Sequence, residues 1–242
     1  MKTGLFEINE NVLIAPDVYR MKLCGDASEI TAPGQFVNIK LEGKFLRRPI
    51  SVYDCGEGFV SIIYKVVGSG TRQMSCAEQG DLLDVMTGLG NGYDLDKCGE
   101  KPLLIGGGAG VPPMYYLCRR LIERGAQPTV IMGFNTESEI FCLDEFSALC
   151  RTIVTTADGS FGTKGFVTDA MGDIDYTHYC ACGPEPMLKA VYAAAAVNGQ
   201  LSFEERMGCG FGACMGCSCK TKYGSKRICK DGPVLESEEV IW

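Results

Sequence analysis

Histidine, tryptophan, long apolar runs and excess positive charge are all scarce in this sequence of 242 residues. The single histidine, His178, excludes a multi-histidine metal site, and the strand-like alternation of residues 176–180 indicates a structural role for it. The longest apolar run, residues 190–197, is far shorter than the ~20 residues that a membrane-spanning helix needs. Acidic residues outnumber basic ones by 30 to 23, and the net charge of -7 disfavours nucleic acid or an anionic membrane as the main partner.

We also expect no signal sequence, because Glu7, Asn9, Glu10 and Asn11 interrupt the apolar residues at the N-terminus. We therefore expect a cytoplasmic protein. In that reducing compartment the 14 cysteines favour metal binding or redox chemistry over disulfide bonds. The one tryptophan, Trp242, ends the chain after two apolar residues, which indicates a packed C-terminal anchor.

The rhythm of apolar residues divides the chain into three parts and predicts a β plus α/β fold. Residues 1–98 contain short alternating runs separated by Gly, Pro and Asp, which predicts an antiparallel β-barrel. In residues 99–200 strands alternate with helices, which predicts a Rossmann-like parallel sheet. The expected strands are 102–105, 129–132, 152–156 and 176–181, and the expected helices are 112–124, 144–150 and 185–197. Residues 201–242 form a short extension that we expect to pack against its neighbours.

Five cysteines fall in the last 34 residues, and four of them have the spacing of an iron-sulfur site. Cys209, Cys214, Cys217 and Cys229 follow the pattern Cys-x4-Cys-x2-Cys-x11-Cys, the plant-type spacing for a 2Fe-2S cluster. The surrounding glycines let backbone N–H groups reach the sulfur atoms. A structural zinc site is the main alternative, but zinc ribbons usually contain two Cys-x2-Cys pairs and this segment contains one. The spacing leaves Cys219 open as a ligand, and we treat it as a spare thiol.

Two short motifs in the predicted barrel suit a flavin nucleotide. In the first, Arg47-Arg48-Pro49-Ile50-Ser51-Val52-Tyr53, a guanidinium can grip a pyrophosphate with two hydrogen bonds and a hydroxyl can reach a flavin ring nitrogen. The glycine turn at residues 68–71 leads into a helix-like stretch at 72–78, which offers backbone N–H groups to phosphate. A surface arginine pair and an ordinary β-turn are the alternatives.

A glycine-rich turn follows the first strand of the second domain and indicates a nucleotide site. Its glycines are Gly106, Gly107, Gly108 and Gly110. Val111 stands where the Rossmann fingerprint has its third glycine, and prolines occupy the first turn of the helix that follows. The next strand closes at residues 133–137, which contain no arginine or lysine for a 2'-phosphate, so NAD is favoured over NADP. A later strand ends at Cys182, which fits a buried structural thiol and a functional one equally well.

Taken in order, these motifs resemble those of the ferredoxin reductase superfamily. The matching segments are residues 48–51, 70–71, 106–113, 156–165, 182–184 and the terminal cysteine loop. The tail is more specific: residues 205–217, followed by Cys229-x-Asp231-Gly232-Pro233-Val234, resemble the electron transfer subunits of the NAD-dependent, type B dihydroorotate dehydrogenases. The resemblance covers essentially the whole chain.

That resemblance implies FAD on the barrel, NAD on the Rossmann-like domain and a 2Fe-2S cluster in the tail. The residues implied for FAD are Arg48, Pro49, Ile50, Ser51, Lys65, Val66, Val67, Gly70 and Thr71. Those implied for NAD are Gly106, Gly107, Gly108 and Gly110, with Cys182 near the nicotinamide. Those implied for iron are Cys209, Cys214, Cys217 and Cys229.

The resemblance also implies a partner and a role in pyrimidine (UMP) biosynthesis. Dihydroorotate would be oxidised at FMN in a separate catalytic subunit, within a heterotetramer of two copies of each subunit. Electrons would then reach NAD+ through the cluster and FAD. This chain is too short to contain an eight-fold β/α barrel of ~250 residues as well, so we expect no dihydroorotate oxidation by it alone. The alternatives are a reductase subunit of another complex, including an electron-bifurcating one, and a non-catalytic redox sensor.

Overall fold

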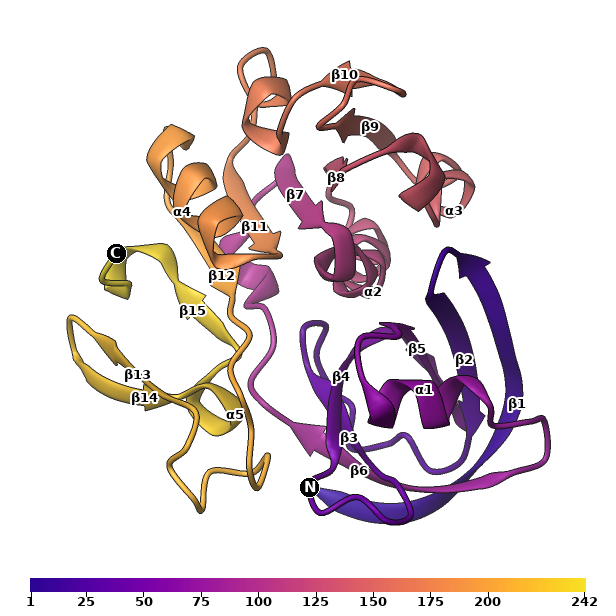
Figure 1. Ribbon diagram of the computed structural model, residues 1–242. Helices are drawn as coiled ribbons and strands as arrows, with labels where there is room; N and C mark the ends of the chain where they lie inside the picture. The colour runs from indigo at the N-terminus through magenta and orange to yellow at the C-terminus, as the bar shows by residue number, and fades with distance from the viewer.

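The computed structural model describes residues 1–242 as a β-barrel, a sheet domain with helices and a C-terminal extension beside both (Figure 1). Six antiparallel strands close the barrel in the order β1-β2-β5-β4-β3-β6. They are β1 (Lys2–Ala15), β2 (Val18–Cys24), β3 (Phe36–Lys40), β4 (Arg48–Gly56), β5 (Phe59–Lys65) and β6 (Leu82–Leu89), with helix α1 (Ser69–Ser75) between the last two. The predicted antiparallel barrel is confirmed.

Alternating apolar side chains explain why the first segment closes into a barrel. In β1, Phe6 and Ile8 are buried while the residues on either side of them are exposed, and Met21 of β2 is buried in the same core. Met74 of α1 joins this core, so the helix packs on the barrel. The side-chain amide of Asn11 holds the helix in place by donating to the carbonyl of Met74 at 2.9 Å.

A seven-stranded sheet in the order β10-β9-β8-β7-β11-β12-β15 forms the second domain. Its strands are β7 (Pro102–Gly107), β8 (Thr129–Phe134), β9 (Arg151–Thr156), β10 (Thr163–Lys164), β11 (His178–Cys182), β12 (Gly199–Ser202) and β15 (Val234–Glu236). Its helices are α2 (Val111–Glu123), α3 (Leu143–Ser147) and α4 (Glu185–Ala194), with short 3-10 turns at Leu95–Lys97, Gly108–Gly110, Glu137–Glu139 and Val167–Ala170. All neighbours pair in parallel except β12 and β15, so the predicted Rossmann-like sheet is confirmed.

The order of the strands reverses between β7 and β11, and this places two predicted motifs side by side. From β7 the sheet grows through β8 and β9 on one side and through β11 and β12 on the other. Gly106 of β7 and Cys182 of β11 are register partners. In open α/β sheets the crevice at such a reversal, beyond the carboxyl ends of the strands, is the usual ligand site. The glycine turn and Cys182 both lie at this crevice.

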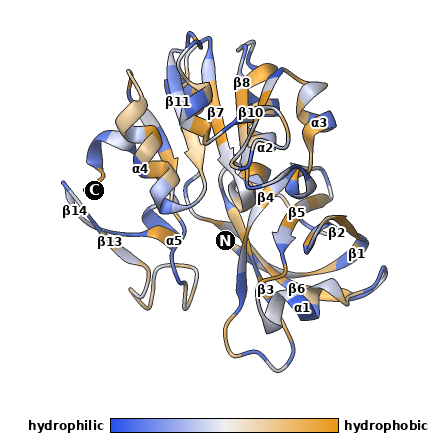
Figure 2. Ribbon diagram, turned by 45° about the horizontal axis from the view of Figure 1, so that its top comes forward, coloured by the Kyte–Doolittle hydropathy of each residue, from blue (hydrophilic) through white to orange (hydrophobic).

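The central strands β7 and β11 are buried along their whole length. Every residue of β7 and of β11 is buried, as expected for parallel strands that are covered on both faces, and orange apolar segments recur along the strands in Figure 2. His178 is one of these buried residues and contacts Gln200 at 3.2 Å, which agrees with the predicted structural role. Among the helices, none is both long enough and apolar enough to cross a membrane.

Several predicted boundaries are wrong by a few residues. β7 extends to Gly107, because Gly106 and Gly107 complete the parallel pairing with β8 and therefore belong to the strand. Helix α1 starts and ends three residues before the predicted 72–78, since the chain becomes helical directly after Gly68. Helix α3 ends at Ser147 rather than at 150, and helix α4 ends at Ala194 rather than at 197, because the chain must turn into the next strand after each helix.

The C-terminal extension joins the sheet and adds a small hairpin. Strands β13 (Ser218–Thr221) and β14 (Gly224–Arg227) form the hairpin, followed by helix α5 (Ile228–Asp231), β15 and a 3-10 turn at Ser237–Glu239. Strand β15 returns antiparallel to β12, which the sequence analysis did not predict, because three residues carry no periodic signal. Trp242 packs against Tyr192 and Phe203, with ring centroids 5.6 and 5.9 Å away, as a C-terminal anchor.

Candidate functional site

A cavity of about 380 Å³ lies where the barrel, the sheet domain and the extension meet, and we call it the interdomain cavity. The barrel side contributes Phe36, Arg48, Pro49, Ile50, Ser51, Ile63, Tyr64, Lys65, Val67 and Thr71. The other side contributes Ala109, Cys182, Ser202, Phe203, Glu204, Glu205, Met207 and Pro233. The structure therefore brings together most residues that the resemblance assigns to FAD, along with Cys182.

The turn before α1 shapes the barrel side of the interdomain cavity. A Cβ atom on Gly70 would overlap the guanidinium of Arg48, so only glycine lets the turn come this close. The side-chain oxygen Oγ1 of Thr71 accepts the N–H groups of Val67 at 3.0 Å and of Gly68 at 3.2 Å. Thr71 thereby fixes the turn, and Gly70 places it against the one arginine that lines the cavity.

Two neighbouring residues point elsewhere. Arg47 pairs with Asp84, Nη2 to Oδ1 at 2.9 Å, and also donates to the carbonyl of Asn38 at 3.2 Å, so it stabilises the barrel. Val66 packs against the barrel core, its N–H donates to the carbonyl of Asp17 at 2.7 Å, and it does not line the cavity. Adjacent arginines look alike in a sequence, and only their partners in the fold separate the two roles.

Cys182 closes the interdomain cavity from the sheet side. Its side chain is 3% exposed at the end of β11. Burial, together with the nearby carboxylate of Glu204, raises the pKa of Cys182 to about 12. The thiol is therefore protonated at neutral pH, which suits contact and positioning rather than nucleophilic attack.

A second cavity, of about 440 Å³, lies at the crevice of the sheet, and we call it the sheet cavity. Its lining residues are Gly107, Gly108, Gly133, Phe134, Asn135, Glu139, Ala157, Phe166, Val167, Thr168, Pro184, Pro186, Met187 and Ala190. No arginine or lysine lines it, which fits a ribose without a 2'-phosphate.

The four glycines implied for NAD divide into two kinds. Gly107 and Gly108 line the sheet cavity, whereas Gly106 and Gly110 do not. A Cβ atom on Gly106 would lie 2.7 Å from Cα of Val111, and one on Gly110 would overlap the carbonyl oxygen of Cys182. Gly106 and Gly110 therefore let helix α2 begin directly against the sheet, which is a packing role.

Sequence reasoning missed part of the sheet cavity. Glu139 accepts the side-chain amide of Asn135 at 2.9 Å, and its carboxylate lies 3.6 Å from Nζ of Lys65 in the barrel. Burial works against ionisation, but the hydrogen bonds from Asn135 and the charge of Lys65 hold the pKa of Glu139 below its usual value. Glu139 lies in a short 3-10 turn with no recognisable motif, so its place beside the cavity emerges only from the fold.

The four cysteines with iron-sulfur spacing lie in the extension as two pairs. The N–H of Cys209 donates to Sγ of Cys214, and the N–H of Cys214 donates back to Sγ of Cys209, both at 3.4 Å. The N–H of Cys229 donates to Sγ of Cys217 at 3.4 Å. No group of three or more ligating side chains converges as it would around one metal ion. Two cysteine pairs instead match a two-iron cluster, in which each iron takes two cysteine ligands.

The surroundings of these sulfur atoms also fit an anionic cluster. Burial opposes ionisation of Cys209, but backbone N–H groups, led by those of Cys214 and Phe211, lower its pKa to about 6. The N–H of Ala213 donates to Sγ of Cys209 at 3.2 Å, and that of Gly216 donates to Sγ of Cys214 at 3.5 Å. All 14 cysteines are free thiols, so no disulfide competes for the ligands. The donor set therefore fits a 2Fe-2S cluster.

Cys219 stands apart from the two pairs. It lies on β13 opposite Lys226 of β14, and burial raises the pKa of its thiol. It lines a separate cavity of about 410 Å³ together with Leu235 and Trp242. This position supports its treatment as a spare thiol.

Residues 209–229, which contain the two cysteine pairs and which we call the cysteine segment, pack directly against the barrel, next to the interdomain cavity. A Cβ atom on Gly210 would overlap the side-chain amide of Asn38, and Nδ2 of Asn38 lies 3.5 Å from the carbonyl oxygen of Cys209. The register partner of Asn38 across β3 and β4 is Pro49, which lines the cavity. Asn38 thus lies between the cysteine pairs and the interdomain cavity.

A barrel and a nucleotide-binding sheet that share one cavity, with a cysteine segment beside it, define a ferredoxin reductase-like oxidoreductase. Two family models match the chain: the oxidoreductase NAD-binding domain over residues 104–193 and the iron-sulfur cluster binding domain of dihydroorotate dehydrogenase B over residues 204–241. The chain is 46% identical to the dihydroorotate dehydrogenase B (NAD(+)) electron transfer subunit of Fusobacterium nucleatum, over 99% of each chain. It is 41% identical to that of a Geobacillus species, over 100% of this chain and 99% of the other. The chain belongs to this family of electron transfer subunits.

Solved structures share the fold. A chain of the NADH-dependent reduced ferredoxin-NADP oxidoreductase, studied for flavin-based electron bifurcation, is 35% identical with a TM-score of 0.91, over 100% of this chain and 91% of that chain. A ferredoxin NADP+ reductase from Neisseria gonorrhoeae, with bound FAD and NADP, is 17% identical with a TM-score of 0.70, over 80% of this chain and 90% of that chain. The second likeness shows the fold alone.

Proposed function

We propose that this chain carries electrons from a dihydroorotate-oxidising catalytic subunit to NAD+, as a step of pyrimidine biosynthesis. One observation carries the proposal: the barrel, the sheet domain and the C-terminal extension all line the same interdomain cavity, and the cysteine pairs lie next to it. A group bound there would contact the cluster side through Met207 and Pro233 and the nicotinamide side through Cys182. The cavity is therefore the meeting point that electron transfer between a cluster and NAD+ requires.

The proposal assigns FAD to the interdomain cavity. FAD, when bound, supplies the conversion between single-electron transfer and hydride transfer. Arg48 would neutralise the pyrophosphate, and the turn held by Gly70 and Thr71 would approach it closely. Ser51 would offer a hydroxyl to the ring, and the protonated thiol of Cys182 would pack where the nicotinamide meets it.

We propose NAD for the sheet cavity and a 2Fe-2S cluster for the cysteine pairs. Gly107 and Gly108 would let the NAD phosphates approach the backbone, while Gly106 and Gly110 hold helix α2 against the sheet. The ligands of the cluster would be Cys209, Cys214, Cys217 and Cys229. The proposed domains are residues 1–98 for FAD, 99–200 for NAD and 201–242 for the cluster.

We propose that the catalytic partner contains FMN and that two copies of it form a heterotetramer with two copies of this chain. We further propose that the partner docks on residues 209–217, which we call the cluster loop. Phe211 and Met215 lie in this loop and are 41% and 54% exposed. Residues 206–230 contain six basic residues and no acidic one, in a chain of net charge -7, which favours an acidic docking surface on the partner. The proposed cluster ligands are free thiols, which favours a reducing compartment, so we propose a cytoplasmic location.

The test is a cofactor analysis of anaerobically purified protein followed by an activity assay. We expect FAD, iron and sulfide in amounts that match one flavin and one two-iron cluster per chain, with bleaching of the visible spectrum by NADH. Dihydroorotate-dependent NAD+ reduction should require the catalytic subunit as well. Zinc without flavin would overturn the proposal, and cofactors without that activity would point to another partner.

A role in an electron-bifurcating complex is the second candidate. It is favoured by the TM-score of 0.91 to the NADH-dependent reduced ferredoxin-NADP oxidoreductase. This role predicts that the assembled complex reduces a low-potential ferredoxin in a reaction coupled to NADH. Dihydroorotate activity without ferredoxin reduction would reject it.

A further inference from the structure

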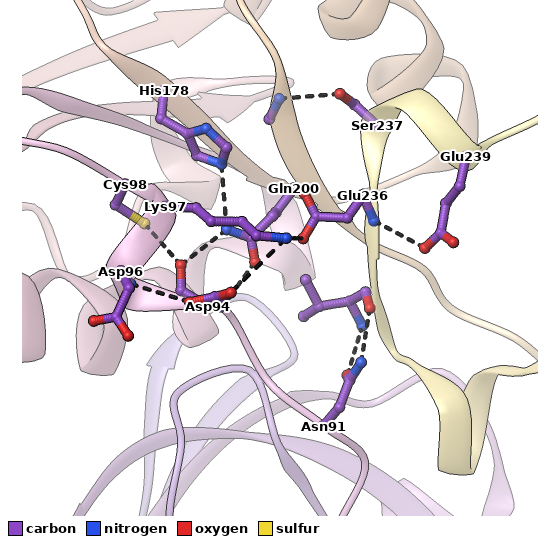
Figure 3. Close-up of polar contacts among 12 residues, drawn as sticks. Asn91, Asp94, Asp96, Lys97, Cys98, His178, Gln200, Glu236, Ser237 and Glu239 are labelled. Carbon is purple, nitrogen blue, oxygen red and sulfur yellow. Dashed lines mark hydrogen bonds and ion pairs between the residues drawn. The ribbon is translucent and has the colours of Figure 1, made fainter.

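One asparagine, Asn91, fastens the linker between the barrel and the sheet domain, residues 90–101, to residues 231–234 of the extension. Asn91 follows β6, and its side-chain amide donates to the carbonyls of Asp231 at 3.1 Å and Val234 at 3.0 Å. Its side-chain oxygen accepts the N–H of Val234 at 3.3 Å, and its own N–H donates to the carbonyl of Gly232 at 2.7 Å. Figure 3 shows Asn91 reaching from the linker toward the extension. A single residue thereby satisfies most of the backbone polar groups of residues 231–234.

The segment that Asn91 holds has two functional neighbours. Cys229, a proposed iron ligand, lies two residues before it, and Pro233, which lines the interdomain cavity, lies within it. The carbonyl of Pro233 also accepts the N–H of Phe203, another residue that lines the cavity. Any shift of residues 231–234 relative to the barrel therefore moves an iron ligand and a cavity wall together.

The backbone of the linker is built for this contact. Gly90 has a φ of +73°, and a Cβ atom there would lie 2.6 Å from Cδ of Pro233 and 2.9 Å from the carbonyl oxygen of Gly232. Only glycine allows the linker to approach the segment at this point. The motif Asp231-Gly232-Pro233-Val234 follows the proposed iron ligand Cys229 but contains no proposed ligand itself. Its contacts with Gly90 and Asn91 give it a structural role instead.

Other contacts hold the same linker at a different place. Nζ of Lys97 lies 2.8 Å from the carboxylate of Glu236, and the amide of Gln200 contacts the carbonyl of Asp94 at 3.0 Å (Figure 3). These contacts join the linker to β12 and β15 and do not touch residues 231–234. The extension thus stays attached when Asn91 is changed, and the contact that Asn91 makes with the cluster side can be tested separately.

We infer that Asn91 is a positioning residue, which sets the placement of the cluster relative to the flavin by holding residues 231–234 against the barrel. The inference rests on the proposed cofactor sites. Electron transfer between two groups weakens steeply with their separation, whereas hydride transfer from NADH occurs on the sheet side of the cavity, away from Asn91. Loss of the side-chain amide should therefore slow electron transfer between the flavin and the cluster and leave hydride transfer from NADH unchanged.

The experiment compares Asn91→Ala and Asn91→Asp with Lys97→Met as a matched control, in the full chain assembled with its catalytic subunit. Asn91 is exposed, so its replacement should not prevent folding, and flavin and iron contents should match those of the unmodified protein. Stopped-flow absorbance would follow flavin reduction by NADH, and freeze-quenched EPR would follow the arrival of electrons at the cluster. Lys97→Met removes an exposed ion pair of the same linker and should change neither rate.

In Asn91→Ala we expect cluster reduction to slow by about tenfold while flavin reduction keeps its rate, a loss within the ~10²-fold that a displacement near 1 Å can cause. Asn91→Asp should be slower still, since its carboxylate would face the two carbonyls that the amide now serves. Equal slowing of both steps, or no slowing of cluster reduction, would overturn the inference. If the unmodified protein holds flavin and cluster but NADH does not reduce the cluster, the proposed function itself fails, which separates the two failures.

Discussion

At the residue scale, the same thiol group has opposite properties in two parts of this protein. Backbone N–H groups in the cysteine loop lower the pKa of Cys209 to about 6, whereas burial at the end of β11 raises that of Cys182 to about 12. A thiolate is the form that binds iron, and a protonated thiol is a neutral packing surface. The local environment thus fits the roles proposed for them, iron ligation by Cys209 and contact with the nicotinamide by Cys182.

The first prediction concerns Cys182. In Cys182→Ala, hydride transfer from NADH to the flavin should slow by about tenfold, because the contact proposed to position the nicotinamide is lost. FAD should remain bound, since its other contacts come from the barrel. Stopped-flow flavin reduction measures the rate. Cys180→Ala is the control, because Cys180 is a buried thiol on the same strand that contacts Cys98 instead of the cavity. An unchanged rate in Cys182→Ala would refute the positioning role.

The second prediction separates the cluster ligands from the spare thiol. Cys214→Ser should abolish the cluster signal in the visible and EPR spectra while FAD is retained, because Cys214 is one half of a cysteine pair. Cys219→Ser should keep the cluster, because Cys219 lines a different cavity with Trp242. Iron and flavin analysis of both variants measures the result. Loss of iron from Cys219→Ser alone would show that the proposed ligand set is wrong.

At the element scale, close backbone contacts bring the strands and helices of the crevice together. Helix α2 begins where Gly106 and Gly110 allow it to touch the sheet, and the linker passes residues 231–234 where Gly90 allows it. Strand β15 brings the end of the chain back to β12, and in the cysteine segment before it Gly210 packs against Asn38 of the barrel. The position of each cofactor site thus depends on contacts between elements that are far apart in the sequence.

The third prediction tests one of these contacts. In Gly110→Ala the new methyl group would overlap the carbonyl oxygen of Cys182, and neither backbone can move freely. The free energy of unfolding should therefore fall by about 1–3 kcal/mol, the usual cost of overpacking. Denaturant unfolding measures it. Gly172→Ala is the control, because nothing lies within 4 Å of a Cβ atom there. Equal stability of the two variants would contradict the packing role of Gly110.

At the scale of the whole molecule, the relative position of barrel and sheet domain decides the size of the interdomain cavity. Arg119 of α2 donates from Nη1 to both carboxylate oxygens of Asp54 in β4, at 2.6 and 2.8 Å. Tyr53 and Tyr115 stack beside this pair with ring centroids 4.6 Å apart. Arg20 also reaches from the barrel to Glu145 at 3.3 Å. These contacts hold the two domains in the orientation that closes the cavity.

The fourth prediction concerns the pair of Arg119 and Asp54. Burial already raises the pKa of Asp54, and in Arg119→Met its carboxylate would lose its partner. The free energy of unfolding at neutral pH should fall by about 1–3 kcal/mol. Without the arginine the pKa of Asp54 in the folded state rises further above its value in the unfolded state. The loss of unfolding free energy in Arg119→Met, relative to the unmodified protein, should therefore be present at neutral pH and shrink as the pH falls and Asp54 is protonated.

Thermal and denaturant unfolding at neutral and acidic pH measure this deficit. Arg124→Met is the control, because the pair of Arg124 and Asp96 is exposed and contributes little. Arg119→Met combined with Asp54→Leu should recover stability, since no buried charge is left unpaired. A deficit that does not change with pH would show that packing, and not the charge of Asp54, is responsible.

The sequence by itself determined what depends on local pattern. Alternating apolar residues predicted the barrel, the alternation of strands and helices predicted the sheet, and the spacing of four cysteines predicted an iron-sulfur site. The resemblance of residues 205–217 and 229–234 identified the family that the comparisons confirm. These features are encoded by neighbours in the chain, because periodicity and ligand spacing are short-range properties. Helix ends were wrong by a few residues, since the turn into the next strand is fixed by tertiary contacts.

Only the tertiary structure decided which residues meet. It separated Arg48, which lines the interdomain cavity, from Arg47, which pairs with Asp84, and it placed Glu139 and Asn91 at sites that no motif marks. It also returned β15 to the sheet, so that a segment from the end of the chain forms a wall of a cavity that begins in the barrel. Such contacts join residues far apart in the sequence, 37 positions for Arg47 and Asp84 and 140 for Asn91 and Asp231. Their energies depend on burial and geometry that exist only once the chain has folded.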